Sequence, residues 1–258
     1  MTQSKRPNRR TRQEKILDPV SQGRTTKEKF KEQHQPKPLV AKTDKQKQYL
    51  SMLNDPNIQM IVCVGLHGCG KSFLSASVAA DKFRKNEISK IIVARPYVQT
   101  GKSSGAKPGT SLEKLYPYVR NVLDPIKQRL GSAVFEIALA DGAHGDIEVQ
   151  ELESIRGRSF DEPSFLLCEE MQQSTPEEML AVVTRIGDSC KLIVSGDLNQ
   201  KDVHGESGLK WLLEFVKRHN LRGVGVVNFD SADDIVRGGL VRDIAIGLMQ
   251  EGKLRANN

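Results

Sequence analysis

One stretch constrains this chain more than any other: Gly65–Ser72, with the sequence GLHGCGKS. It fits G-x-x-x-x-G-K-[ST], the phosphate-binding P-loop. Glycines let the backbone turn tightly and approach an anion, and successive N–H groups at a helix start form an anion-binding concavity. Apolar residues 59–64 precede the loop as a buried strand does, and residues 73–84 have a helical apolar pattern. Strand, loop and helix together predict a nucleotide-phosphate site.

The rest of the chain predicts strands alternating with helices, which is typical of an α/β fold with a mainly parallel sheet between helices. Expected strands cover 59–64, 90–96, 165–168, 191–195 and 225–229. Expected helices cover 73–84, 112–130 with interruptions near Pro117 and Pro125, 175–186, 208–219, and one or two segments within 232–250. Another short helix should begin at Thr43 or Asp44. Residues 131–162 are hard to interpret, although the alternation around Ile147 and Val149 indicates a short strand or hairpin.

The basic charge is concentrated at the N-terminus. Residues 1–48 contain 14 Lys and Arg against 5 Asp and Glu, so the remainder is nearly neutral despite the net charge of +7. Residues 1–40 have few large apolar side chains, and we expect a disordered basic tail. This tail either contacts nucleic-acid phosphates or is simply a solvated extension. Residues 41–258 are expected to form a single P-loop domain, with a loop or hairpin insertion around 99–162 and a flexible loop over 99–110.

Neither a membrane span nor a secretory signal is expected. The four cysteines show no C-x-x-C pairing, so the sequence indicates neither a zinc site nor a disulfide framework and favours a reducing, cytoplasmic location.

Polar residues follow several predicted strands at their carboxyl ends, where open α/β sheets bind ligands. Lys71 is expected to reach the β- and γ-phosphates and Ser72 to hold Mg²⁺. Glu169-Glu170 resembles a Walker B acid pair: Glu169 would hold the metal and Glu170 would polarise the attacking water. A solvated strand end is the alternative interpretation of this pair.

Three further positions are candidates for the same reaction. Gln200 is expected to position water or sense the γ-phosphate, with Asp197 anchoring its loop or the metal shell. Arg237 is a candidate arginine finger on the transferring phosphate, although a surface arginine is the commoner interpretation. Arg95 follows the second strand, and Arg156 and Arg158 flank Gly157; these three are candidates for nucleic-acid contact or for action on a neighbouring subunit. The alternative for 156–158 is an ordinary basic turn.

Taken together, these stretches resemble the PhoH family of P-loop ATPases over Thr43 to Met249. The resemblance rests on the P-loop and on six further stretches: 93–96 (VARP), 155–160 (IRGRSF), 169–172 (EEMQ), 184–187 (TRIG), 196–200 (GDLNQ) and 235–237 (IVR). It implies a RecA/superfamily 1-like ATPase core that uses ATP and Mg²⁺, and some relatives are reported to act on RNA.

The resemblance also implies roles for particular residues. Gln46 would read the adenine ring, Lys71 and Ser72 the phosphates and metal, Glu170 would be the catalytic glutamate, Gln200 the γ-phosphate sensor and Arg237 the late arginine. The nucleotide-contacting residues are then Gln46 together with Gly65, His67, Gly68, Cys69, Gly70, Lys71, Ser72 and Phe73. One departure is Glu169, where relatives usually carry Asp; the longer side chain could shift the metal and slow hydrolysis.

The sequence leaves two functions in competition. The first is an ATPase coupled to RNA or single-stranded nucleic acid, working as an oligomer such as a hexameric ring because one core does not make a two-lobed helicase cleft. The second is a nucleotide-dependent regulatory or binding module, which the scarcity of aromatic residues favours because bases lack a stacking platform. A small-molecule kinase is a weaker third interpretation.

Overall fold

The computed structural model describes residues 35–96, 111–139, 145–202 and 204–252. Most of the expected basic tail, the expected loop over 99–110 and Gly142 lie outside these described residues. Among them, no helix combines the length and hydropathy needed to cross a bilayer.

A six-stranded sheet forms the centre of the molecule. Its strands are β1 (Met60–Gly65), β2 (Lys90–Arg95), β3 (Ile147–Glu151), β4 (Ser164–Cys168), β5 (Cys190–Gly196) and β6 (Val224–Phe229). The spatial order is β3-β2-β4-β5-β1-β6, and every neighbouring pair is parallel. The predicted α/β class with a mainly parallel sheet is therefore confirmed. Parallel strands are usually buried on both faces, and β1 and β4 are buried along their whole length.

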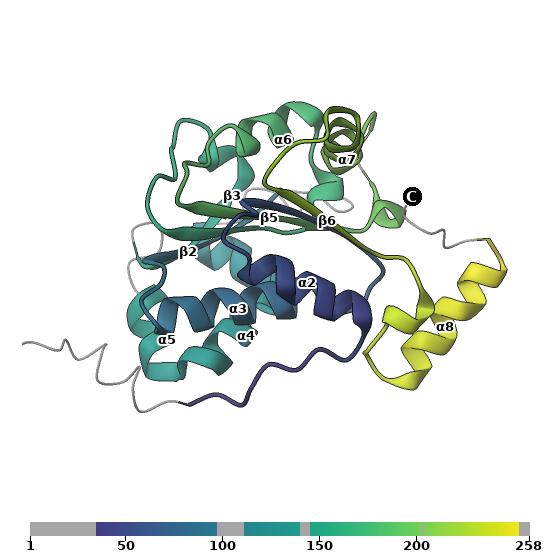
Figure 1. Ribbon diagram of the computed structural model, residues 1–258, viewed down its shortest axis with the longest axis horizontal. Helices are drawn as coiled ribbons and strands as arrows, with labels where there is room; N and C mark the ends of the chain where they lie inside the picture. Colours follow the sequence, from purple (N-terminus) through teal and green to yellow (C-terminus); the bar gives the residue numbers. More distant parts are fainter. Residues whose placement is uncertain (1–34, 97–110, 140–144, 203, 253–258) are drawn as a thin grey trace, which may run out of the picture.

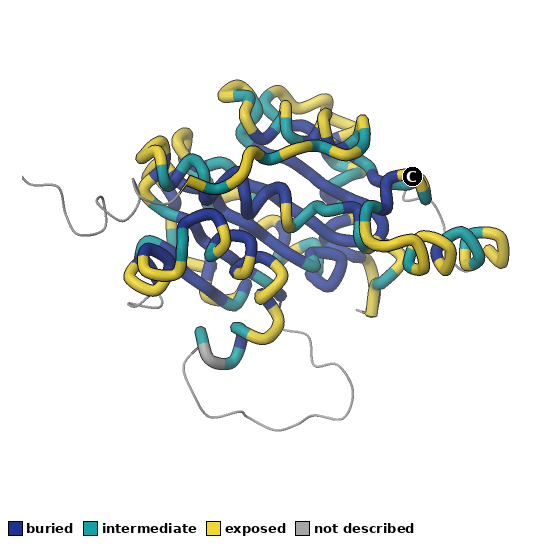
Figure 2. Tube along the Cα trace, turned by 90° about the horizontal axis from the view of Figure 1, so that it is seen from below, coloured by how far each residue is buried: buried dark blue, intermediate teal, exposed yellow. Residues whose placement is uncertain are grey.

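Helices cover both faces of the sheet (Figure 1). On one side lie α2 (Asp44–Asn54), α3 (Lys71–Arg84), α4 (Ser111–Leu130) and α5 (Ser132–Leu139), and on the other α6 (Pro176–Val183) and α7 (Gly208–His219). Each layer has its own apolar core, one including Tyr49, Leu74 and Phe83 and the other Met179 and Leu209. The strands lie between these cores, and Figure 2 shows buried strands running through the centre of the molecule.

Two helix starts have the side-chain caps that the sequence predicts. Thr43 caps α2 by accepting a hydrogen bond from the Gln46 N–H. Thr175 and Glu178 form a reciprocal capping box at α6, with Pro176 in the first position. Such caps satisfy N–H groups that have no partner inside the helix, so both helix starts are fixed locally.

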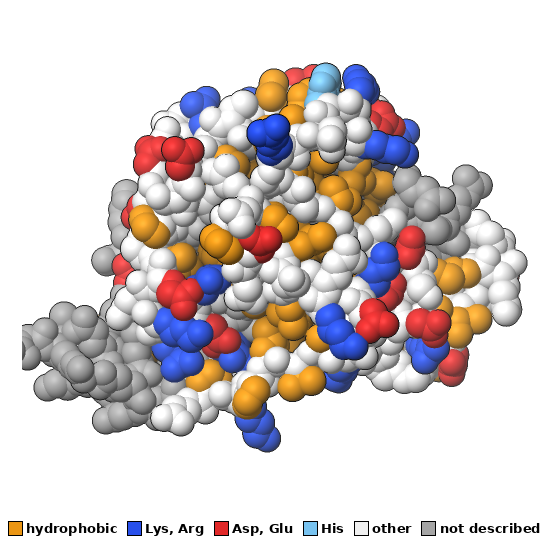
Figure 3. All heavy atoms as spheres, in the orientation of Figure 1, with side chains coloured by type: hydrophobic (Ala, Val, Ile, Leu, Met, Phe, Trp, Pro, Cys, Tyr) orange, Lys and Arg blue, Asp and Glu red, His pale blue; other side chains and the backbone are white. Residues whose placement is uncertain are grey.

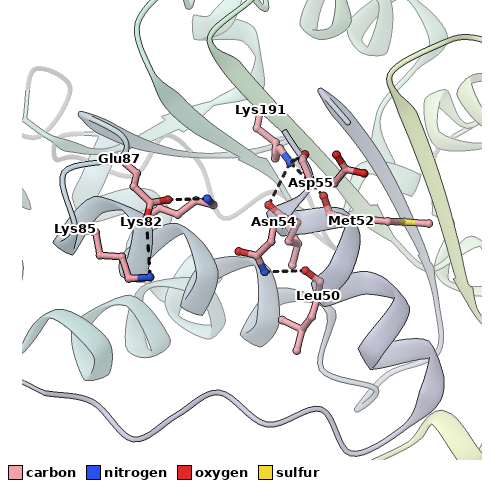
Figure 4. A network of polar contacts seen from close by, with 9 residues as sticks. Leu50, Met52, Asn54, Asp55, Lys82, Lys85, Glu87 and Lys191 are labelled. Carbon is pink, nitrogen blue, oxygen red and sulfur yellow. Dashed lines mark hydrogen bonds and ion pairs between the residues drawn. The ribbon is translucent and has the colours of Figure 1, made fainter. Parts of the chain in front are cut away.

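Lys191 of β5 fixes the other end of α2 (Figure 4). Its Nζ donates hydrogen bonds to the carbonyl oxygens of Met52, Leu53 and Asp55 at 3.1, 3.1 and 2.7 Å. These carbonyls belong to the helix end, where backbone acceptors lack partners and a cation is favoured. Burial, reinforced by the positive charge of Lys82, lowers the pKa of Lys191 to about 8.

Some sequence-based expectations were wrong. The helix over 111–130 is not interrupted: α4 runs through Pro117 and Pro125. Tertiary packing compensates for the backbone hydrogen bonds that the two prolines cannot make. The helix α4 buries a row of apolar side chains, and Arg129 forms a bidentate ion pair with Asp81 of α3 at 2.6–2.7 Å. The helix α5 was not anticipated, and α6 ends at Val183 rather than near 186.

The chain ends, within the described residues, in the short 3₁₀ helix η5 (Ala232–Asp234) and in α8 (Gly239–Gln250). Arg237 therefore precedes the last helix. In Figure 1, α8 projects from the side of the molecule beyond the carboxyl end of β6.

Candidate nucleotide-binding site

The P-loop joins β1 to α3 at the carboxyl edge of the sheet. Gly68 and Gly70 have φ values of +77° and +88°, the left-handed region that favours glycine. Gly70 is the N-cap of α3, so the loop leads directly into the positive end of that helix. The backbone has the conformation expected of a phosphate-binding loop.

The Lys71 side chain folds back over this loop. Its Nζ donates to the carbonyl oxygens of Gly65 and Leu66 at 2.7 and 2.9 Å. The Cys69 thiol is buried and donates to the Leu66 carbonyl at 3.0 Å, and burial raises its pKa. The ammonium group of Lys71 thus lies beside the loop with neutral acceptors that a phosphate can replace.

The structure brings together Ser72 and Glu169, the two predicted metal ligands. The Ser72 hydroxyl donates to Glu169 Oε2 at 2.5 Å and accepts from Asn121 Nδ2 of α4 at 3.3 Å. Glu169 is 4% exposed, and burial raises its pKa, although the bond from Ser72 opposes the shift. Its other oxygen, Oε1, is buried without a hydrogen-bond partner among the described residues. Two adjacent oxygen groups with an unsatisfied buried acceptor fit Mg²⁺, which prefers carboxylate and hydroxyl ligands.

Glu170 occupies a strained turn immediately after β4. Its backbone is left-handed, with φ 56° and ψ 35°, a conformation that costs a non-glycine residue about 1–3 kcal/mol and is concentrated at functional sites. The next residues form the short 3₁₀ helix η3 (Met171–Gln173). Gln172 Nε2 donates to Glu170 Oε2 at 2.6 Å, while Gln172 Oε1 accepts from the Asp197 N–H at 3.2 Å. Gln172 therefore joins the candidate base to the loop that follows β5.

Gln173 makes a second connection to that loop. Its Nε2 donates to the Gln200 carbonyl at 2.6 Å and to Asp202 Oδ2 at 2.9 Å. Asp197 caps the short 3₁₀ helix η4 (Leu198–Gln200), and Gln200 Nε2 donates to Asp197 Oδ2 at 2.6 Å. Asp197 thus anchors the Gln200 side chain, and the consecutive glutamines hold both strand ends in one arrangement.

Gln46 lies on the opposite side of the P-loop. Its Nε2 donates to the Cys69 carbonyl at 2.8 Å and its Oε1 accepts from the Lys42 N–H at 2.7 Å. A glutamine amide has two donor hydrogens and two acceptor lone pairs, so one of each remains for a purine edge. Gln46 is held against the loop in a way that suits the predicted adenine contact.

Residues 235–237, from the C-terminal part of the chain, pack on the P-loop. The N–H groups of Val236 and Arg237 both donate to the Gly68 carbonyl, at 3.0 and 3.2 Å. A Cβ at Gly68 would lie 2.9 Å from the Arg237 Cβ. Gly68 is thus required by the close approach of this segment as well as by its own φ.

A cavity of about 440 Å³ lies between these elements. Of the predicted residues, it is lined by Gln46, His67, Gly68, Gly70, Lys71, Ser72, Phe73, Glu169, Glu170, Asp197 and Arg237. Gly65, Cys69 and Gln200 are not part of its lining. The first two belong to the loop backbone beneath it, and Gln200 is joined to the lining through Asp197.

Asn121 and Gln172 are site residues that the sequence analysis missed. Asn121 lines the cavity from α4, on a segment with no motif of its own. Gln172 belongs to the stretch EEMQ that carries the family resemblance, so its place three residues after Glu169 was the available signal.

The remaining arginines lie away from this cavity. Arg95 donates to the Tyr118 carbonyl at 2.8 Å and lies over the Tyr118 ring. Arg158 pairs with the buried Glu148 of the edge strand β3 at 2.7 Å and stacks over Phe160. Arg156 is exposed at the end of a 3₁₀ helix. The fold does not bring these three to the P-loop of their own chain.

Comparison with known proteins agrees with this geometry. The family model described as PhoH-like protein matches residues 38–247. Protein PhoH from Escherichia coli (strain K12) is 34% identical over 205 residues, covering 79% of this chain and 56% of that protein. The PhoH-like proteins of Bacillus subtilis (strain 168) and Synechocystis sp. are each 32% identical, covering 81% and 79% of this chain and 63% and 60% of their own lengths. The chain thus spans about three fifths of these relatives.

Proposed function

This chain belongs to the PhoH-like protein family, and from that premise we propose that it binds ATP and hydrolyses it with Mg²⁺ in the P-loop cavity. The observation that carries the proposal is the Ser72–Glu169 contact of 2.5 Å beside the P-loop, with Glu170 lining the same cavity. A phosphate loop, an oxygen pair suited to Mg²⁺ and a second carboxylate are the parts that phosphoryl transfer to water requires.

Each part has a defined task in this proposal. The P-loop N–H groups and Lys71 bind the phosphates, and Lys71 exchanges its carbonyl acceptors for phosphate oxygens. Mg²⁺, held by Ser72 and Glu169, would neutralise phosphate charge. Glu170 orients a water molecule, whose oxygen attacks the γ-phosphorus while the bond to the β-phosphate oxygen breaks. The proton passes to Glu170 and then to solvent, leaving ADP and phosphate.

The Glu at position 169 is compatible with this mechanism. Its longer side chain still reaches the Ser72 hydroxyl, so the carboxylate remains beside the proposed metal. Arg237 lines the cavity of its own chain, which favours a role on the transferring phosphate in cis over a role on a neighbouring subunit.

We also propose that hydrolysis is coupled to RNA or single-stranded nucleic acid in an oligomer. The basic residues 1–48 support this coupling because lysine and arginine neutralise backbone phosphates. A nucleotide-dependent switch is the second candidate, and one observation favours it. The segment 236–237 is bonded to the P-loop through Gly68, so a change in the loop can reach the C-terminal helix without nucleic acid.

The test compares ATP hydrolysis of the wild type and Glu170→Gln, with and without single-stranded RNA, and measures ATP binding in parallel. We expect Glu170→Gln to bind ATP while losing about 100-fold or more of its turnover. The control is Glu177→Gln, the same change at an exposed position on α6. Equal turnover in Glu170→Gln and the wild type would refute the role of Glu170. ATP binding with negligible wild-type turnover would favour the switch.

A further inference from the structure

The helix α8 is far more apolar than its surroundings explain. Seven of its twelve residues are apolar, yet Ala245 is its only buried residue. Leu240, Ile244 and Leu248, spaced four residues apart, are 73%, 52% and 37% exposed. A twelve-residue helix is marginal alone in water and takes its stability from packing an apolar face. This stripe, Leu240–Ile244–Leu248, therefore needs a covering surface.

The side of α8 next to this stripe already packs against the body of the protein. Ala245 is buried in a small cluster with Leu66 and Ile235, and Val241 and Met249 pack against it. This contact anchors α8 beside the P-loop while directing the stripe away from the body. In Figures 1 and 2 the helix projects from the molecule and is mostly exposed.

The same chain carries an apolar groove between α7 and β6. The groove has a volume of about 580 Å³, and its lining includes Leu213 and Val216 of α7 and Val224 and Val226 of β6. Residues 224 and 226 share one face of the strand, because side chains alternate along it. Val226 is 39% exposed, and β6 is an edge strand paired only with β1. Figure 3 shows apolar side chains exposed between α7 and β6 and again on α8.

These two surfaces are similar in length, and each carries charged side chains beside its apolar residues. At 1.5 Å per residue α8 is about 18 Å long, and the six residues of β6 extend about 20 Å at 3.3 Å per residue. An amphipathic helix laid in an apolar groove is a common recognition mode. Lys217 and Glu214 both line the groove, and Asp243 lies beside Ile244 on α8. Of the two groove charges, Lys217, in the basic last turn of α7, is the one that complements Asp243. Each chain thus offers both an apolar helix face and an apolar groove of similar length.

We propose that α8 of one copy of this chain docks in the α7–β6 groove of a second copy. The interface gives the oligomer proposed above a defined surface, and it rests on that oligomer but not on ATP hydrolysis. Residues 236–237 lie just before α8 and donate hydrogen bonds to the Gly68 carbonyl. Docking of α8 is therefore coupled to the P-loop of the chain that supplies the helix.

The test is sedimentation velocity on the full chain over a wide concentration range. The helix variant is Leu240→Asp with Ile244→Asp, and the groove variant is Val226→Asp; all three residues are exposed, so the changes should not prevent folding. The control is Leu180→Asp, the same change at a leucine of α6 that is 49% exposed. We expect each interface variant to weaken association at least about tenfold, with the control unchanged.

Mixing the two variants identifies the pairing. The groove variant keeps an intact helix and the helix variant an intact groove, so the mixture should form a complex that neither variant forms alone. A monomeric wild type, undiminished association of the helix variant, or a mixture that stays monomeric would each overturn the proposal. Binding of a fluorescent ATP analogue, measured on the same samples, tests the proposed function separately, since the monomeric variants retain the complete cavity.

Discussion

Replacing Gln172 with leucine should separate catalysis from nucleotide binding. The side chain is 1% exposed and joins Glu170, through a bond of 2.6 Å, to the Asp197 N–H, through a bond of 3.2 Å. The residues that line the cavity include Glu170 and Asp197 but not Gln172. The variant therefore changes how the candidate base is held without removing any group that lines the ATP cavity.

The size of the effect follows from what each partner loses. Glu170 is partly exposed, so water replaces the lost donor, whereas the N–H of Asp197, a residue that is 3% exposed, is left unsatisfied at about 1–3 kcal/mol. Leucine recovers part of this by burial, and we expect a net loss of about 1–2 kcal/mol, or about 2–8 °C in Tm. Loss of orientation at Glu170 should lower kcat by about 10- to 100-fold.

The assay measures kcat, the dissociation constant for ATP and Tm for three variants. Gln172→Leu should lower kcat and leave the ATP dissociation constant within about twofold. Gln172→Glu keeps the acceptor for the Asp197 N–H but places a second, buried carboxylate beside Glu170, where desolvation and like-charge repulsion disfavour it, so it should recover neither stability nor kcat. Gln59→Leu, which removes a bond of 2.8 Å to the Gly187 carbonyl elsewhere in the fold, is the control for stability alone. An unchanged kcat in Gln172→Leu, or a loss shared equally by Gln59→Leu, would show that Gln172 does not orient Glu170 for catalysis.

Three more predictions concern Lys191, Gly68 and Gln46. Lys191→Met should be measured by denaturant unfolding against pH. The pKa of Lys191 is lowered to about 8 in the folded state, so between pH 8 and 10.5 the unfolded state binds more protons than the folded state. The free energy of unfolding of the wild type should therefore rise by about 1 kcal/mol relative to the variant as pH rises through this window. A difference in unfolding free energy that does not change with pH would show that the three carbonyl acceptors cancel the effect of burial. Gly68→Ala should lower ATP affinity and Tm more than Gly205→Ala, because both glycines have positive φ but only Gly68 meets Arg237, and equal losses would contradict the close approach. Gln46→Ala should reduce the preference for ATP over GTP in competition binding, and an unaltered preference would remove Gln46 from adenine recognition.

The sequence predicted the parts of this protein whose signals are local. The apolar run before the P-loop, the glycines within it and the capping box at Thr175 each act within a few residues. Their positions in the structure follow from backbone sterics and local hydrogen bonds. The convergence of Lys71, Ser72 and Glu169 was also predictable, because the carboxyl ends of parallel strands share one edge of a sheet.

The features that were missed depend on tertiary partners. Pro117 does not break α4, since packing on α3 outweighs its missing hydrogen bond. Arg158 was a candidate for contact with nucleic acid or a neighbouring subunit, and the sequence does not show the buried Glu148 that pairs with it. Asn121 carries no local signal for the same reason: its role depends on where α4 lies relative to Ser72. Side chains that act across the fold cannot be recognised from their own neighbours in the sequence.

The position of β1 in the sheet has a consequence for how the protein is made. Residues 60–64 pair with residues 192–196 on one side, and residues 60–65 pair with residues 224–229 on the other. Both neighbours leave the ribosome long after the P-loop does, and non-local strand pairing is the slow part of folding. During synthesis the strand that precedes the phosphate loop therefore lacks its neighbours until β5 and then β6 have emerged. Truncated chains that lack β6 leave one side of β1 unpaired, and we expect them to bind nucleotide more weakly than the full chain.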